Sequence, residues 1–522
     1  MSTDIARLHA VFDLAMRIGE GMLSNGAAAS EVTSTVLRVT SAAGLRSVAV
    51  QVTFDEVSIS YLPDDRSTPF TRIRAAGHRA QDFARLTAFE EVTEGYVAGD
   101  IPLEEARARV AAIPLEKPHY PFLLVAAGFA VMGGGAALSF GTDLVVILFA
   151  TLAAGLLTVV VDRLSRLRLP LFYGQAAGAL VGMLVAAVVS FVHPGVNSSV
   201  VTVACIIVLL AGLTSIGAMQ DAITGWYVTA SARILETIML TVGVVIGVRA
   251  GMVLTDLMGA DLSVTTAMPV TLTSALMVLV SGAVMGLGFG VATYVPLRLL
   301  GWGAAGAAAS SVISHGIVGL GIDRVWSVAA ASLVVGVISV ILARRLRAPA
   351  LLFVMAGVVP LVPGSRIYRG LQGLGSDVVE GSVELMSAAG IAIAIAGGAV
   401  LGQLLASRLL RPRTRSAVSF TPVIAAPFTT LRRRRLSMVP RRRRLRTAPE
   451  ISVEPSTMTG EMTSLPPEIA DALEADLDPP EHAVRTTPAP GQGWEPRPPG
   501  RRPEDGTAEA SGPSADQPPQ HR

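Results

Sequence analysis

Long apolar stretches alternate with short polar loops between Pro121 and Ala406. These 286 residues contain 22 charged side chains, and none of them is lysine. A helix that crosses a bilayer needs about 20 mostly apolar residues. Soluble helices of this length carry a polar face, and stretches such as 144–161 lack one. The pattern therefore predicts an α-helical polytopic membrane protein with about ten transmembrane helices. The predicted spans are 121–141, 143–161, 172–192, 199–217, 233–254, 270–292, 299–319, 326–343, 348–364 and 385–406.

The pattern before residue 118 is different and predicts a small soluble α+β domain over residues 1–117. Apolar residues recur at helical spacing in four segments and alternate with polar ones in three others. The helices are expected over 5–23, 28–43, 79–98 and 103–113, and the strands over 48–53, 57–62 and 70–74. Asp55, Glu56, Asp64 and Asp65 favour a charged turn over a cation site.

The chain after residue 407 has little apolar material around which to fold. Residues 408–446 carry 13 arginines and no acid, and residues 447–522 are rich in proline, glutamate and serine. This composition is typical of disorder, so a disordered cytosolic tail is expected over 408–522. Next to a membrane, its arginine runs favour contact with anionic lipid over nucleic acid.

Composition narrows the function classes. Charged residues make up 16% of the chain, against about 25% in a typical soluble protein. The single cysteine, Cys205, excludes a disulfide scaffold and a cysteine-based metal site. No Walker A motif is present, so ATP is not the expected driver. We expect neither a metal nor a cofactor.

Arginines in the short loops predict the orientation, because such residues gather on the cytoplasmic side. Arg163, Arg298 and the 344–347 loop fall on one side if both termini are cytoplasmic. Arg324, Arg366 and Arg369 fall on the opposite side. Two of these follow the ninth stretch directly, so that stretch is expected to end irregularly.

An internal repeat relates the two halves of the apolar region. Ala211, Gly212 and Gly225 recur as Ala356, Gly357 and Gly370, each 145 residues later. We therefore expect two five-helix halves, 118–260 and 261–407. Because five is odd, the second half would be inverted relative to the first. Inverted repeats recur in secondary transporters, whose substrate sites lie at interrupted helices near the midplane.

The fourth and ninth stretches are the interrupted pair. Pro360 and Pro363 remove backbone donors, and the freed backbone groups need partners because lipid offers none. A zwitterion suits this place, since its carboxylate fits a helix N-terminus and its ammonium fits free carbonyls. A packing kink without a ligand is the alternative. The candidate substrate-binding residues are Gly217, Met219, Gln220, Pro360, Pro363, Gly364, Ser365 and Tyr368.

Three acids lie near these breaks. Asp221, Glu236 and Glu384 are candidates for proton coupling, because ionisable residues inside a membrane bundle commonly carry ions or protons. Arg233, one turn before Glu236, is a candidate partner for it. The alternative is that these acids only favour the start of a helix through its dipole.

With these residues, the chain resembles the threonine/serine exporters of bacteria, especially actinobacteria. The most specific segment is Pro360-Leu361-Val362-Pro363-Gly364 with the following Tyr368. Residues 220–227 and 22–27 are also similar to the family. Glu31-Val32-Thr33 stands where many members carry Arg-Val-Glu.

The resemblance implies a non-enzymatic secondary transporter with a cytosolic N-terminal domain fused to two five-helix halves. It would export threonine, serine and similar small amino acids by alternating access, coupled to the proton motive force. It would be a multi-pass protein of the bacterial plasma membrane with both termini cytoplasmic, and homo-oligomerisation is left open. The alternatives are a channel-like or scaffold membrane protein, and a membrane-anchored hydrolase that uses the N-terminal domain.

Overall fold

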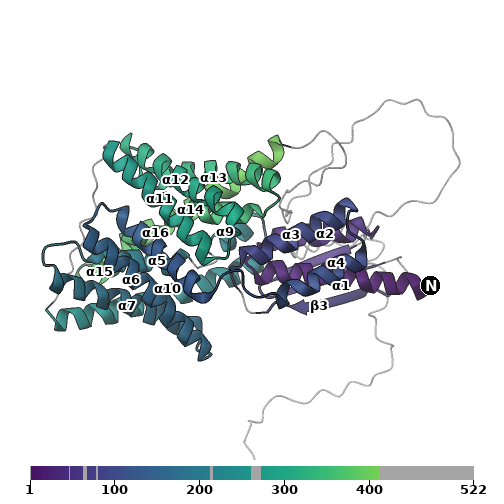
Figure 1. The fold of residues 1–522 in the computed structure, drawn as a ribbon, viewed down its shortest axis with the longest axis horizontal. Coiled ribbons are helices and arrows are strands. Elements are labelled where there is room, and N and C mark those ends of the chain that lie inside the picture. Colours follow the sequence, from purple (N-terminus) through teal and green to yellow (C-terminus); the bar gives the residue numbers. More distant parts are fainter. Residues whose placement is uncertain are drawn as a thin grey trace, which may run out of the picture. The chain divides into compact units, whose positions relative to one another are not determined.

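The structure, a computed structural model, describes residues 2–45, 48–62, 68–77, 80–211, 215–259 and 272–410. All of these residues belong to one compact unit (Figure 1). The predicted tail lies outside the described residues from position 411 onward, and so do its arginine runs. The boundaries predicted at residues 117, 260 and 407 stay predictions.

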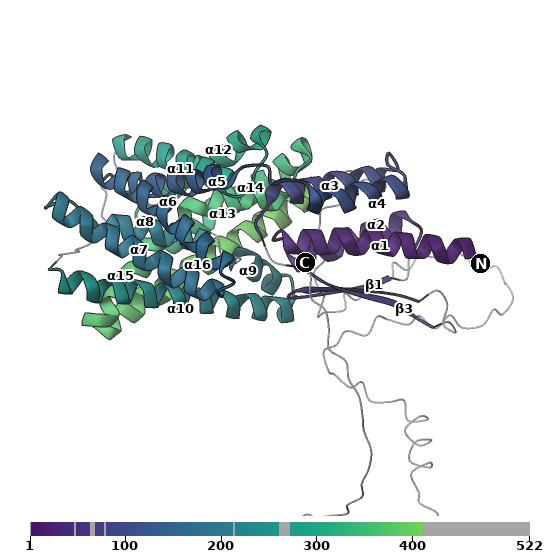
Figure 2. The same ribbon diagram turned by 60° about the horizontal axis from the view of Figure 1, so that its bottom comes forward.

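The N-terminal region is a three-stranded antiparallel sheet with helices on one face (Figure 2). Val48 pairs with Tyr61 across the first two strands, and Glu56 pairs with Ala75 across the next two. Val57 and Ile59 of the central strand are fully buried beneath the helices. The four helices and three strands predicted before residue 118 are present, but the helix predicted from residue 79 begins at Phe83, where the Asp82 carboxylate accepts a hydrogen bond from the Arg85 amide. The elements are α1 (Ser2–Ser24), α2 (Ala29–Ala42), β1 (Val48–Thr53), β2 (Glu56–Tyr61), β3 (Phe70–Ala75), α3 (Phe83–Ala98), α4 (Leu103–Ala112) and the 3-10 turn η1 (Ile113–Leu115).

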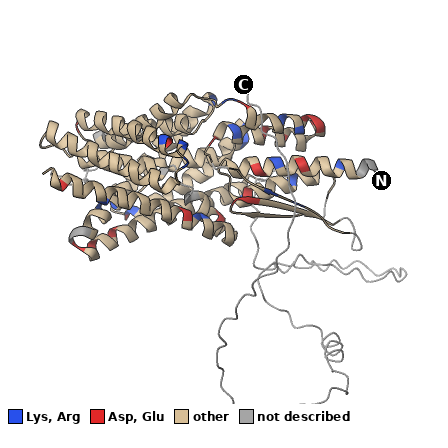
Figure 3. Ribbon diagram, turned by 90° about the horizontal axis from the view of Figure 1, so that it is seen from below, with Lys and Arg blue, Asp and Glu red and all other residues tan. Residues whose placement is uncertain are grey.

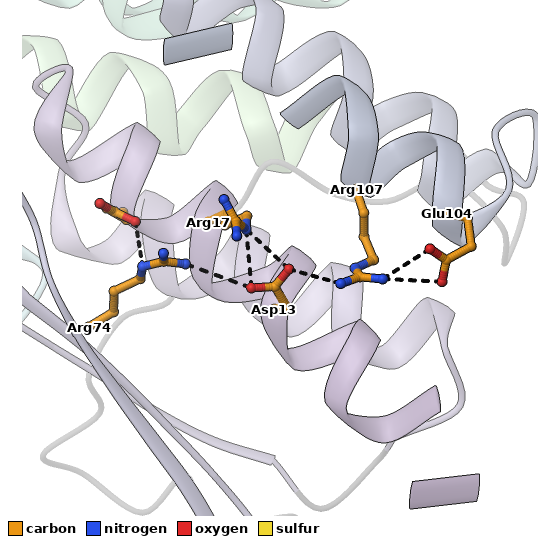
Figure 4. Close-up of polar contacts among 6 residues, drawn as sticks. Asp13, Arg17, Arg74, Glu104 and Arg107 are labelled. Atoms are coloured by element: carbon orange, nitrogen blue, oxygen red, sulfur yellow. Dashed lines mark hydrogen bonds and ion pairs between the residues drawn. The ribbon is translucent and has the colours of Figure 1, made fainter. Parts of the chain in front are cut away.

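A network of ion pairs joins three elements of this region (Figure 4). Asp13 of α1 lies 3.1 Å from Arg17, 3.3 Å from Arg107 of α4 and 3.9 Å from Arg74 of β3. Burial would raise the pKa of Asp13, but the hydrogen bonds and charges of Arg17 and Arg107 hold it below its ordinary value. The network therefore depends on an ionised carboxylate.

The rest of the described chain is a helical bundle with few charged side chains (Figure 3). Six of its helices are long and apolar enough to cross a membrane, namely α6, α7, α10, α11, α13 and α16, and the bent pair α14–α15 makes up to seven. Each of the ten predicted stretches coincides with a helix or with two successive helices. The exact count of ten spans stays a prediction. The elements are α5 (Phe122–Leu138), α6 (Leu144–Arg166), α7 (Leu171–Val192), α8 (Ser199–Ala211), α9 (Ser215–Ile223), α10 (Tyr227–Leu257), α11 (Leu272–Ala292), α12 (Leu297–Gly319), α13 (Arg324–Leu346), α14 (Ala350–Val358), the 3-10 turn η2 (Val359–Leu361), α15 (Gly364–Ser376) and α16 (Val378–Leu409).

Two helix pairs in the bundle are held close by the same glycine spacing. Gly243 and Gly247 place α10 directly against the backbone of α7, and Gly398 and Gly402 place α16 against the backbone of α13. A Cβ at any of the four would collide with a carbonyl of the facing helix. Small residues four apart are a common way for membrane helices to approach. The packing thus recurs in the two predicted halves.

The first helices of the two predicted halves pack against each other and run in opposite directions. Gly128 of α5 meets Gly288 and Ala292 of α11, whereas Gly135, further along α5, meets Met285, earlier in α11. The N-terminal region contacts one end of this bundle. There, the Phe83 amide donates to the carbonyl of Thr293, and the Tyr120 hydroxyl to that of Val295.

Candidate functional site

The ninth predicted stretch is broken, and the break separates α14 from α15. The two segments meet at an angle of 49°. Pro360 lies at the start of the 3-10 turn, where a missing amide costs least, and Pro363 immediately precedes α15. The carbonyl of Gly357 accepts a hydrogen bond from the Ser310 hydroxyl of α12 at 2.5 Å. Gly364 begins α15 and packs against Ile207 of α8, where a Cβ would clash.

A polar cavity of about 390 Å³ lies at this break. Its volume suits a small ligand, since ligand pockets commonly range from about 300 to 1,000 Å³. It lies toward the end of the bundle away from the N-terminal region, since Ser139 and Arg324 are at the far ends of α5 and α13. Its polar lining consists of Ser139, Ser281, Ser311, Ser314, Ser365, His315, Arg324, Arg366 and Arg369.

Two of the three arginines that line the cavity form ion pairs with the same acid. Glu384 of α16 lies 3.3 Å from Arg366 and 3.5 Å from Arg369. These two side chains are 30% and 38% exposed, so both retain room for a second partner. Among the described lining residues none is an acid, and three are arginines. Such a cavity can bind a carboxylate, because the guanidinium group presents several donors in a plane.

A second, larger cavity of about 520 Å³ lies on the other side of the same break and shares Val362 and Pro363 with the first. Its only polar lining residues in the described chain are Thr237 and Thr241. Both hydroxyls donate to carbonyls of their own helix, at 2.9 and 2.8 Å. This apolar cavity therefore offers a zwitterion no charged partner.

The fourth predicted stretch corresponds to α8 and α9, between which residues 212–214 lie outside the described part of the chain. Here the charged pair is Asp221 and Arg233, which are 0% and 2% exposed. The Arg233 guanidinium donates to Asp221 Oδ2 at 2.8 Å and to the carbonyl of Ala27 at 3.0 Å. The Ala29 amide donates to Asp221 Oδ1 at 2.8 Å. The pair thus fastens the bundle to the start of α2, and Arg233 pairs with Asp221 rather than as expected with Glu236.

The predicted substrate-binding residues do not all converge. Pro360, Pro363 and Ser365 line the polar cavity, and Gly364 lies between two of them. Met219 faces only the apolar cavity, and Tyr368 is fully buried. Gly217 and Gln220 lie at the junction with the N-terminal region. Of the predicted acids, Glu384 lies behind the polar cavity, Asp221 lies at the junction and Glu236 is half-buried on α10.

The three arginines and His315 are not among the site residues predicted from the sequence. The signal was present, because Arg324, Arg366 and Arg369 were the residues that violated the expected charge asymmetry of the loops. In the structure all three arginines line the polar cavity, and two of them form ion pairs with Glu384.

A third, small cavity of about 60 Å³ lies where the N-terminal region meets the bundle, and its acids are also not among the predicted site residues. Glu31 and Arg38 of α2 and Glu90 of α3 line it. Burial raises the pKa of Glu31 to about 8, helped by the charges of Glu90 and Asp221. Burial raises the pKa of Glu90 to about 7, although Arg38 opposes the shift.

Comparisons with known proteins agree with one another. A family model described as "Putative threonine/serine exporter" matches residues 13–255, and one described as "Threonine/Serine exporter, ThrE" matches residues 278–405. A "Probable threonine/serine exporter" of Mycobacterium tuberculosis is 30% identical over 410 residues, covering 76% of this chain and 77% of the relative. A "Threonine/serine exporter" of Corynebacterium glutamicum is 31% identical over 428 residues, covering 78% and 85%. No solved structure matches.

Proposed function

Because the chain belongs to the threonine/serine exporter family, whose members are transporters and not enzymes, we propose that it exports threonine, serine and similar small amino acids. The family and the several apolar helices make it a multi-pass membrane protein. We place it in a bacterial plasma membrane. Because the members of this family are transporters, the alternative of a membrane-anchored hydrolase is excluded.

The observation that carries the proposal is the cationic, hydroxyl-lined cavity at the break between α14 and α15. The substrate carboxylate binds Arg366 and Arg369 beside the first turn of α15, where helix amides add to the positive potential. The serine hydroxyls of the cavity accept hydrogen bonds from the substrate ammonium group. They also form hydrogen bonds with the hydroxyl group of the substrate side chain. An apolar amino acid would leave part of this polar lining unpaired, which disfavours its binding.

Transport follows from alternating access between two inverted five-helix halves. The recurring glycine contacts of α7–α10 and α13–α16 support the repeat, and the opposite directions of α5 and α11 support the inversion. The predicted interruption in each half is the place where short segments can shift without unwinding a long helix. A channel-like protein or scaffold would need neither the repeat nor the buried charges.

The N-terminal region lies at the cytosolic end in this proposal, with both termini cytoplasmic. It contacts the bundle next to Arg298, one of the arginines expected on the cytoplasmic side, and Glu91 forms an ion pair with that residue. The polar cavity then lies toward the outside. The arginine-rich tail is proposed to contact anionic lipid, and removal of the chain after Leu410 should leave export intact.

Protons of the proton motive force are the proposed coupling ion, with Asp221, Glu236 and Glu384 as the candidate carriers. Glu384 ranks first by its surroundings. Its carboxylate, when protonated, releases Arg366 and Arg369 for the substrate, whereas Asp221 is enclosed between Arg233 and α2. If Asp221→Asn, Glu236→Gln and Glu384→Gln all kept proton-driven threonine flux, none of these three acids would be the coupling carrier.

The transport proposal is tested in proteoliposomes that exchange radiolabelled threonine across the membrane. The double variant Arg366→Gln, Arg369→Gln should lose exchange by at least about tenfold, the equivalent of about 1.4 kcal/mol of binding. Arg163→Gln, which removes an exposed arginine at the end of α6, should leave exchange unchanged. Full exchange in the double variant would contradict the assigned site, and no exchange in the unaltered protein would contradict the function.

A further inference from the structure

The Glu31 side chain is half-buried where α2 meets the bundle. Within the described parts of the chain its carboxylate makes no hydrogen bond or ion pair, whereas its backbone amide donates to the carbonyl of Ala28 at 3.1 Å. It lines the 60 Å³ cavity together with residues from both predicted halves, which are Gln220 of α9, Val340 and Ala343 of α13, Ala350 and Leu351 of α14, and Gln403 of α16. A carboxylate in such a place depends on the contact between the N-terminal region and the bundle for its burial.

The charges that face Glu31 come from four elements. Asp221 of α9 and Glu90 of α3 are acids, and both disfavour a second negative charge. Arg38 of α2 is occupied by Glu90, at 3.7 Å, and by Glu94. Arg233 of α10 is occupied by Asp221. The cavity residues from α13, α14 and α16 carry no charge. The arginines of the junction are thus committed to other acids.

We propose that Glu31 binds the counter-transported proton at the cytosolic end of the path and releases it when the N-terminal region separates from the bundle. The inference rests on the proton-coupled export proposed above and adds a carrier in the N-terminal region. In the covered state the carboxylate takes up one proton, which reaches it through the bundle from the outside, and forms the neutral acid. On separation it gives the proton to cytosolic water and becomes a carboxylate again.

The direction of the effect follows from burial. In the covered state the pKa of Glu31 is about 8, whereas its ordinary value is 4.5. Covering the site therefore favours the protonated acid, and uncovering it at cytosolic pH favours release of the proton. Closure of the cytosolic end and protonation are coupled in this way, as an exchanger requires. Asp221 is not free to serve this role while its two oxygens accept bonds from Ala29 and Arg233.

The test uses the full chain in proteoliposomes and compares two kinds of threonine flux. Exchange of threonine for threonine needs no net proton movement, whereas accumulation against a gradient requires an imposed pH difference. Glu31→Gln should keep exchange and lose pH-driven accumulation by at least about tenfold. Glu116→Gln, which alters an exposed acid of the same region, should keep both.

The outcomes separate the two proposals. Absence of exchange in the unaltered protein contradicts the transport function, and exchange without pH-driven accumulation contradicts proton coupling. Normal pH-driven accumulation in Glu31→Gln overturns the role of Glu31 alone.

A second measurement does not depend on the flux of the variant. Because the native protein holds a proton that the unfolded chain releases between pH 4.5 and about 8, the melting temperature should fall as pH rises through this window. In Glu31→Gln the melting temperature should fall less over this window. Glu90→Gln measures how much of the fall comes from Glu90, whose pKa is about 7. An identical pH profile in the unaltered protein and Glu31→Gln would also overturn the proposal.

Discussion

In each predicted half of the bundle, ion pairing joins a short helix to the long helix that follows it. In the first half the acid is on the short helix, where Asp221 of α9 meets Arg233 of α10. In the second half the charges are reversed, because Arg366 of α15 meets Glu384 of α16. Arg366 lies 145 residues after Asp221, the offset that also relates the repeated glycines.

The difference lies in what covers each pair. The first pair is nearly excluded from solvent and bonds to the start of α2, whereas Arg366 and Glu384 are 30% and 20% exposed at a cavity. A buried pair with its remaining bonds satisfied is costly to break. A partly exposed pair is worth little and can change partners. The Asp221–Arg233 pair therefore holds the N-terminal region against the bundle, whereas the Arg366–Glu384 pair is available to a ligand.

The greatest loss of stability should follow from breaking the buried pair of Asp221 and Arg233. Asp221→Ala leaves Arg233 buried without its acid and should destabilise the protein by about 3–5 kcal/mol. The melting temperature of the detergent-solubilised protein measures this loss. Glu384→Ala is the matched change in the other half and should cost about 1 kcal/mol or less. Equal losses in the two variants would end the distinction between the pairs.

The next effect concerns the approach of α15 to α8. Gly364→Ala places a Cβ against Ile207 and the backbone of Val203, so we expect a loss of about 1–3 kcal/mol from overpacking. Gly217→Ala, near the predicted interruption of the first half, would meet only the flexible end of Arg233 at 3.2 Å and should cost less. Gly390→Ala, where no atom lies within 4 Å, serves as the control for helix propensity. Melting temperatures that rank Gly217→Ala as the more harmful change would refute this account of the break.

A smaller effect should appear in substrate binding. Glu384→Gln removes the carboxylate that competes for Arg366 and Arg369, so the threonine concentration for half-maximal exchange should fall by about fivefold, the equivalent of about 1 kcal/mol. Glu380→Gln changes an exposed acid on the same helix and should have no effect. A half-maximal concentration that rises in Glu384→Gln would mean that the acid binds substrate itself.

The smallest effect lies far from both pairs. Asp13→Asn weakens the network that joins α1, β3 and α4, and its partial exposure limits the loss to about 0.5–1 kcal/mol. Because the folded pKa of Asp13 lies below its ordinary value of 3.8, its contribution is present above that pH and is lost as the pH falls further. Unfolding measured near pH 7 and near pH 3 should therefore differ less in Asp13→Asn than in the unaltered protein.

Hydropathy patterns predicted most of the architecture, because long apolar helices and alternating strands follow from local periodicity. The break at Pro360 and Pro363 was predictable for the same reason, since proline acts on its own neighbours. The partners of the charged residues could not be predicted in this way. The bonds of Asp221 to Ala29 and of Arg233 to Ala27 join positions far apart in the chain, and no local pattern encodes them. The position of Glu31 beneath the bundle depends on the same long-range contact.

Protection of an introduced cysteine tests whether the amino-acid carboxylate binds at the break between α14 and α15. Cys205 is fully buried, so Ser365→Cys introduces an accessible thiol in the polar cavity. Threonine should slow its modification by a methanethiosulfonate reagent, and threonine amide, which lacks the carboxylate, should not. Ser382→Cys, on the exposed surface of α16, should react equally with and without threonine. Modification of Ser365→Cys at the same rate with and without saturating threonine would contradict the account.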